Sequence, residues 1–145
     1  MKIIRTLSFL IVLAFITSAA HSQCKMFAKK YCLDKIKPYS FNGQINTVKL
    51  SEGEMAQLFL TFYKDQEYRV YVCSQGNFES VEFKLVDASN NNLLFYNKDH
   101  QYTDTWDFLS KSTHEVEIRV FIPEDKSSTM VQSGCVSILV GFKEK

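Results

Sequence analysis

THEVEIRVFI, residues 113–122, alternates apolar side chains with charged or aromatic ones. From Val116 onward the even-numbered residues are Val, Ile, Val and Ile, and Glu117, Arg119 and Phe121 stand between them. Successive side chains of a β-strand point to opposite faces of a sheet, so this alternation predicts a strand with one face on an apolar core.

The same period of two recurs in segments to either side, at residues 58–63, 68–73, 81–85 and 135–142. Weaker strands fit residues 44–50, 93–96 and 102–108, the last with Tyr102, Trp106 and Phe108 on one core-filling face. Polar turns separate these segments at intervals of roughly ten residues, which is typical of an all-β sandwich or barrel. The chain is therefore expected to form a two-sheet β-sandwich, jelly-roll or Greek-key, of about eight strands.

Two further segments precede the strands. Lys2 and Arg5 lead into an apolar run at residues 7–16 and then into small residues up to Ser22, the pattern of a secretory signal peptide. The apolar run is shorter than the roughly 20 residues of a membrane span. We expect residues 1–22 to be cleaved, 23–40 to form a short helical segment that Pro38 ends, and 41–145 to form the sandwich.

The balance of charges argues against two classes of partner. Removal of residues 1–22 takes two of the 17 basic residues and none of the 16 acidic ones. The remaining near-neutral chain gives no electrostatic attraction to nucleic acid or to an anionic membrane. No later segment is long and apolar enough to span a bilayer.

Four cysteines follow the predicted cleavage point: Cys24, Cys32, Cys73 and Cys135. An even count in a short exported chain predicts two disulfides and a secreted, periplasmic or cell-envelope location. The cysteines are 8, 41 and 62 residues apart, which is not the clustered spacing of a metal site, so no metal is predicted. A lipid-modified cysteine would follow a Leu-Ala-Gly-like triplet, whereas His-Ser-Gln precedes Cys24.

The pairing of the cysteines has two solutions. Their positions in the alternation, opposite the apolar residues of each strand, place Cys73 and Cys135 on the outer faces of their strands. They either bond each other, with Cys24 bonded to Cys32, or they bond Cys24 and Cys32 and hold the helical segment on that face. We slightly favour the first pairing, although eight helical residues rise about 12 Å and a disulfide requires Cα atoms within about 7 Å, so the segment would have to bend.

No catalytic residue or cofactor is predicted. His114 has no nucleophile and acid placed beside it by the sequence, and no Gly-x-Ser-x-Gly motif is present. The oxygen-bearing side chains of the loops at residues 87–92 and 99–104 are explained by turn chemistry. The binding candidates are aromatic residues of outward parity, since exposed rings stack on sugars or anchor protein partners: Phe59, Tyr63, Tyr71 and Phe121. The competing interpretation is that the helical segment covers one outer face.

Three motifs resemble bacterial pre-peptidase C-terminal (PPC-like) domains over residues 50–142. They are the hairpin FYKDQEYRVYV (62–72), the pair FKLVD (83–87) and LLF (93–95), and the closing strand GCVSILV (134–140). The chain also resembles short exported proteins of bacteria. The resemblance implies a jelly-roll sandwich that is not itself catalytic and that serves binding or secretion; it carries over no calcium-binding residue.

The expected function is a secreted, non-catalytic binding or accessory module that contacts a protein or glycan, and not an enzyme. The alternatives are a structural component of the envelope and, less favoured, a secreted hydrolase.

Overall fold

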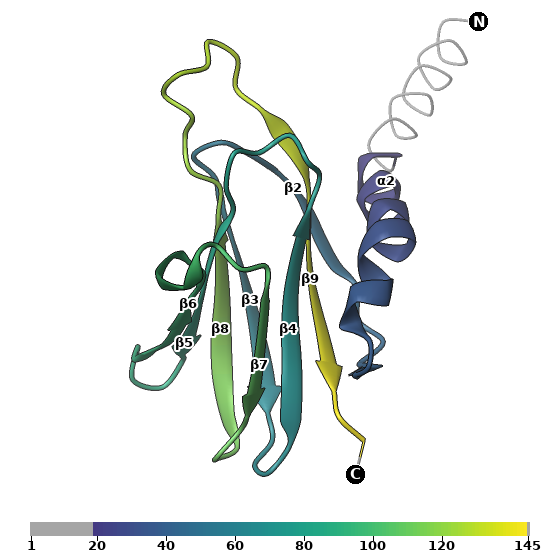
Figure 1. Cartoon of the computed structure of the whole chain (residues 1–145), viewed down its shortest axis with the longest axis vertical. Coiled ribbons are helices and arrows are strands. Elements are labelled where there is room, and N and C mark those ends of the chain that lie inside the picture. The colour runs from purple at the N-terminus through teal and green to yellow at the C-terminus, as the bar shows by residue number, and fades with distance from the viewer. Residues whose placement is uncertain (1–18, 145) are drawn as a thin grey trace, which may run out of the picture.

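A computed structural model describes residues 19–144 of the chain (Figure 1). Most of the predicted signal peptide, residues 1–18, lies outside the described residues. The described part begins with helix α2 (Ala19–Phe27), which continues into a π-helical turn, η1 (Ala28–Cys32), and a 3-10 turn, η2 (Leu33–Ile36). This helical segment ends two residues before Pro38, as the sequence predicts. None of the described helices is long and apolar enough to cross a membrane.

Nine strands and one further 3-10 turn follow the helical segment. They are β1 (Ser40–Phe41), β2 (Asn46–Ser51), β3 (Met55–Phe62), β4 (Glu67–Ser74), β5 (Glu82–Asp87), β6 (Leu93–Tyr96), η3 (Asn97–His100), β7 (Thr105–Leu109), β8 (His114–Phe121) and β9 (Ser133–Phe142). The predicted strands are all present, and β1 is an addition of two residues.

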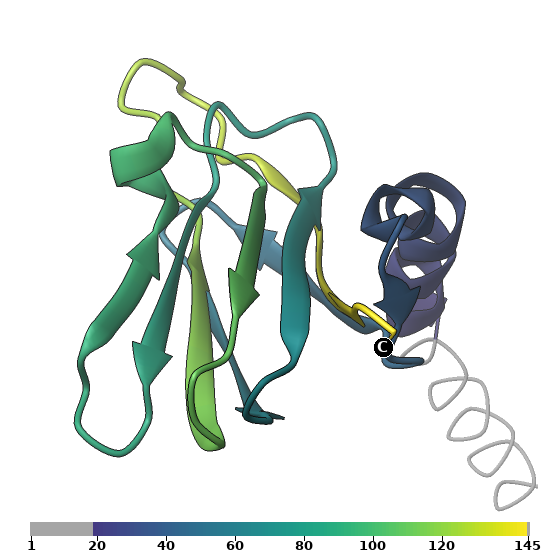
Figure 2. The same cartoon turned by 60° about the horizontal axis from the view of Figure 1, so that its bottom comes forward.

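The strands form two antiparallel sheets, which confirms the two-sheet β-sandwich. One sheet has the order β1-β9-β4-β7, with β2 also paired to β9; we call it the helix-covered sheet. The other has the order β3-β8-β5-β6; we call it the open sheet. Figure 2 shows the two layers with the helical segment on the outside of the helix-covered sheet.

The core lies between the sheets and follows the predicted alternation. Val116, Ile118 and Val120 of β8 are fully buried. They pack with inward-facing residues of both sheets, among them Phe62, Val70, Phe83, Leu85 and Val136. Burial of each such side chain contributes about 1.5–3 kcal/mol, so this alternation accounts for much of the drive to stack the sheets.

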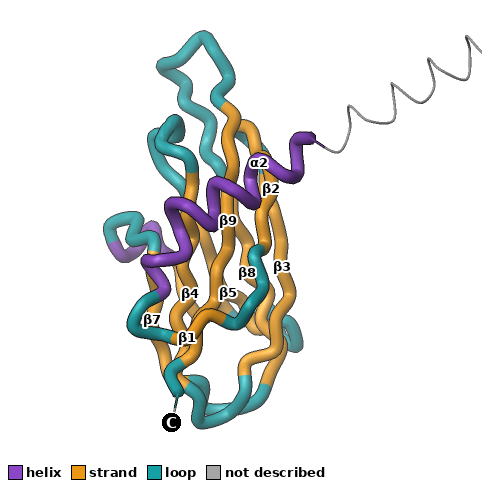
Figure 3. Tube along the Cα trace, turned by 90° about the vertical axis from the view of Figure 1, so that its right-hand side faces the viewer, coloured by secondary structure: helices purple, strands orange, loops and turns teal. Residues whose placement is uncertain are grey.

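A second, smaller core lies under the helical segment. Cys24, Ala28, Cys32 and Ile36 are buried at a spacing of four residues. They face the outer side of the helix-covered sheet, where Tyr71, Cys73 and Leu139 are also buried. Figure 3 shows the segment running obliquely across β9.

The disulfides join these two layers, so the favoured pairing was wrong and the alternative is present. Cys24 is bonded to Cys135 and Cys32 to Cys73, with S–S distances of 2.00 and 2.07 Å. The four-residue spacing turns both helical cysteines toward the sheet rather than toward each other. Cys73 lies opposite Ser137 in the register, so Cys73 and Cys135 are diagonal neighbours rather than a directly facing pair.

Candidate binding surface

The outer faces of the two sheets differ in what covers them. The helical segment occupies the outer face of the helix-covered sheet, whereas none of the described elements packs over the outer face of the open sheet (Figure 2). The outer residues of β3 and β8 lie side by side on this bare face, because Met55 pairs with Phe121 and Phe59 with Glu117.

Large apolar side chains project from this bare face. Met55 is 53% exposed, Phe59 52% and Phe121 36%. Gln57 and Arg119 form the polar row between the Met55–Phe121 pair and Phe59. We call these five residues, together with Glu117, the β3–β8 face.

An ion pair fixes the middle of the β3–β8 face. Arg119 Nη2 donates to Glu117 Oε2 at 2.6 Å, and the Glu117 side chain is only 7% exposed. The hydrogen bond from Arg119 holds the pKa of Glu117 below its ordinary value, although burial acts in the opposite direction. Both groups are therefore charged at neutral pH and held in one geometry.

A second polar group borders the β3–β8 face on β5 and β6. Glu82 accepts hydrogen bonds from the Tyr96 hydroxyl and from Lys98 Nζ, the latter at 3.0 Å. Burial and the bond to Glu82 raise the pKa of Tyr96 to about 12, so this hydroxyl remains a neutral donor. Lys84 Nζ lies 4.2 Å from the centre of the Tyr96 ring. On its β5 side the face is thus bordered by charges that already have partners.

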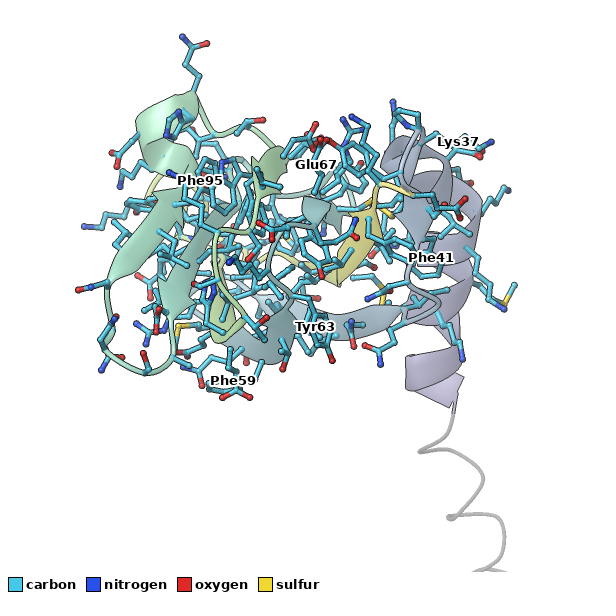
Figure 4. The ribbon with its side chains drawn as sticks, turned by 90° about the horizontal axis from the view of Figure 1, so that it is seen from below. Lys37, Phe41, Phe59, Tyr63, Glu67 and Phe95 are labelled. Atoms are coloured by element: carbon cyan, nitrogen blue, oxygen red, sulfur yellow. A yellow bond between two sulfur atoms is a disulfide. The ribbon has the colours of Figure 1, made fainter. Side chains whose placement is uncertain are left out.

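Three of the four aromatic candidates are on the surface. Phe59 and Phe121 belong to the β3–β8 face, and Tyr63 is exposed just beyond the end of β3. Figure 4 shows Phe59 and Tyr63 along one edge of the molecule, apart from the helical segment. Tyr71 is only 6% exposed, because the helical segment packs over it. The expectation of an exposed Tyr71 was wrong, and the competing interpretation of a covered outer face holds for this residue.

Other exposed apolar residues were not predicted. Met55 is not predicted from the sequence because β3 begins three residues before residues 58–63, where the alternation is clear. Leu93 and Leu94 of β6 are exposed. Tyr102 was expected in the core, yet it precedes β7, has a positive φ of 55° and is 44% exposed.

The polar loop residues and the histidine make local contacts. His114 Nδ1 lies 2.9 Å from the carbonyl oxygen of Ser112. Asp87 accepts bonds from the backbone and hydroxyl of Ser89, as in an Asx turn. Among residues 19–144, no three His, Cys, Asp or Glu side chains gather in a metal-binding arrangement.

Comparison with known proteins finds a likeness in fold but none in sequence families. The sequence matches no family model and no curated protein. The fold is similar to that of Aeromonas hydrophila PliG, a periplasmic lysozyme inhibitor of g-type lysozyme, with a TM-score of 0.52 and 12% sequence identity. The likeness covers 74% of this chain and 90% of that chain. At this identity it shows a shared fold.

Proposed function

We propose that this protein is an extracytoplasmic, non-catalytic module that binds a protein partner through the β3–β8 face. The observation that carries the proposal is the exposure of Met55, Phe59 and Phe121 around the Glu117–Arg119 pair on a sheet face that no described element covers. Aromatic residues, Met and Arg are the side chains enriched at protein–protein interfaces.

Two further observations support the compartment and the class of partner. Paired cysteines are typical of secreted and periplasmic proteins, and both pairs are formed here. PliG, which has the same fold, is an inhibitor of another protein. This second support is an analogy between folds, and it favours a protein partner without identifying one.

The chemistry of the β3–β8 face favours a protein over a glycan. Its exposed apolar groups are Phe and Met, whose side chains offer no hydrogen-bonding atom apart from the weakly accepting thioether sulfur of Met55. Its central charged groups, Glu117 and Arg119, already bond each other. Apart from the exposed amide of Gln57, sugar hydroxyls would therefore find few free partners, whereas an apolar protein surface would be well matched.

Site-specific photocrosslinking in the native cell tests this proposal. A photoreactive phenylalanine analogue replaces Phe59 or Phe121 one at a time, and Lys29, which is exposed on the opposite side of the molecule, serves as the control position. We expect a discrete protein adduct from positions 59 and 121 and none from 29. A g-type lysozyme in that adduct would extend the likeness to PliG from fold to partner.

The proposal is overturned if neither face position yields an adduct, or if position 29 yields the same one. Equal labelling would mean that the crosslinks report random collisions rather than contact through the β3–β8 face.

A further inference from the structure

A cavity of about 530 Å³ lies beside β4, on a different part of the molecule from the β3–β8 face. Pairing between β4 and β7 ends at Tyr71 and Thr105, and β4 continues to Ser74 (Figure 1). The cavity opens beside this end of β4, which pairs with β9 but not with β7. Its other walls come from residues 78–81, Phe83, Asn97, Tyr102 and Asp104.

The walls of this cavity are held in place before any ligand arrives. The buried side chain of Asn97 accepts a bond from Phe83 N–H at 2.8 Å and donates to the carbonyl oxygens of Val81 and Thr103 at 2.9 and 3.1 Å. Val72 N–H donates to the Asp104 carbonyl oxygen at 2.8 Å. A preformed cavity avoids part of the ordering cost of binding.

The charged side chains that line the cavity are all acidic. Its charged lining residues are Glu79 and Asp104, and no Lys, Arg or His is among the lining residues. Neither carboxylate takes part in an ion pair with any described residue. Phe78 and Tyr102 add aromatic rings to the same walls.

Tyr71 supplies a hydroxyl group to the same cavity. Its side chain is more than nine-tenths buried and lines the cavity, yet its hydroxyl has no hydrogen-bond partner among the described side chains and backbone. Burial raises the pKa of Tyr71, and the nearby Asp104 carboxylate raises it further, so the hydroxyl stays protonated. The hydroxyl is not among the fully buried polar atoms that lack a partner, so it reaches the water of the cavity and is open to a bound group.

We infer that this cavity binds a guanidinium group. A guanidinium is a planar cation that stacks on aromatic rings and donates in parallel to carboxylates, and it is less strongly hydrated than an ammonium. The walls offer these two kinds of contact, together with the Tyr71 hydroxyl oxygen as an acceptor. The group comes either from an arginine side chain of a polypeptide or from free arginine.

Titration of the folded, disulfide-bonded protein with N-acetyl-arginine amide tests the inference, followed by amide chemical shifts. We expect saturable shifts at Ser74, Ser80 and Asp104. N-acetyl-citrulline amide, the neutral isostere, should bind at least about tenfold more weakly, because it lacks the charge. Free L-arginine is titrated in the same way. If it binds more tightly than N-acetyl-arginine amide, the natural ligand is the free amino acid. If it binds equally or more weakly, the natural ligand is an arginine side chain of a polypeptide.

Variants locate the binding. Asp104→Asn and Glu79→Gln should each weaken it about fivefold to tenfold, and Tyr71→Phe should weaken it while leaving the ring in place. Glu115→Gln, at an exposed acid of the open sheet, should bind as the unaltered protein does. The inference is overturned if citrulline binds equally, if no arginine compound shifts these amides, or if Glu115→Gln matches the effect of the cavity variants. These outcomes are separate from photocrosslinking at Phe59 and Phe121.

Discussion

At the scale of single residues, outward parity and exposure are different properties. Glu117 has outward parity in β8, yet it is nearly as buried as a core residue. Phe59 faces it from β3 and Val86 from β5, and Arg119 closes over its carboxylate. The pairing partners on both sides, rather than the alternation of one strand, decide how much of a side chain reaches water.

Glu117 should make stability depend on pH. Its pKa is lower in the folded protein than the value of about 4.3 expected in an unfolded chain. The stabilisation is therefore fully present above that unfolded value and is lost as the pH falls through the lower folded value. We expect Glu117→Gln to cost about 1 kcal/mol in the free energy of unfolding at pH 7, with most of the difference gone near pH 2. Urea unfolding at both pH values measures this.

Glu115→Gln is the matched control for that experiment, since Glu115 is exposed on the same strand. It should leave the free energy of unfolding nearly unchanged. An equal loss at both pH values for Glu117→Gln would show that packing, and not the charge, is what the substitution removes.

At the scale of elements, the end of the helical segment lies unusually close to β9. A Cβ added to Gly141 would stand 2.6 Å from Ile36 Cγ2 and 2.8 Å from Tyr39 Cβ. Arg69 holds the same region by donating to the carbonyl oxygen of Lys37 at 2.7 Å while it pairs with Asp107. Glycine at position 141 is thus required by the close approach of the helical segment and the residues after it, and not by the strand itself.

Gly141→Ala should therefore push the helical segment away from the sheet. We expect a loss of about 1–3 kcal/mol in the free energy of unfolding, as for other overpacked sites. Gly76→Ala is the matched control, because an added Cβ at Gly76 meets nothing within 4 Å. Thermal or urea unfolding of both variants makes the comparison. Similar behaviour of the two would contradict the close packing of Ile36 on β9.

At the scale of the whole molecule, the two disulfides fasten one layer to another. Cys24–Cys135 spans 111 residues and encloses Cys32–Cys73, which spans 41. Both bonds tie the helical segment to the central strands β9 and β4. Loops of these lengths restrict the unfolded chain strongly.

Peptide mapping without reduction should recover these two linked pairs from the exported protein. Cys32→Ser together with Cys73→Ser should lower the free energy of unfolding by about 4 kcal/mol. It should also speed hydrogen exchange in η1 and η2 more than in the open sheet. A linked peptide that joins Cys24 to Cys32 would contradict the structure.

The sequence alone predicts the sandwich well and the surface less well. The alternation of apolar and polar residues locates β8 and β9, because the backbone geometry of a strand by itself makes successive side chains point to opposite faces. It cannot say which outer face a separate segment will cover, which is why Tyr71 was expected at the surface and the cysteine pairing was misjudged. The cavity beside β4 depends on Asn97, whose side chain bonds residues from two separate places in the chain, Val81 and Phe83 in one and Thr103 in the other. The signal peptide and the PPC-like resemblance stay predictions.

The position of β9 has a consequence for assembly. It follows every other described strand in the sequence, yet it lies in the middle of its sheet, between β4 and both β1 and β2. Because a polypeptide is made from its N-terminus, β2 and β4 exist before the strand that joins them, and Cys24 exists before its partner Cys135. Unpaired edges of this kind invite self-association. This sheet is therefore open to aggregation until β9 has been made.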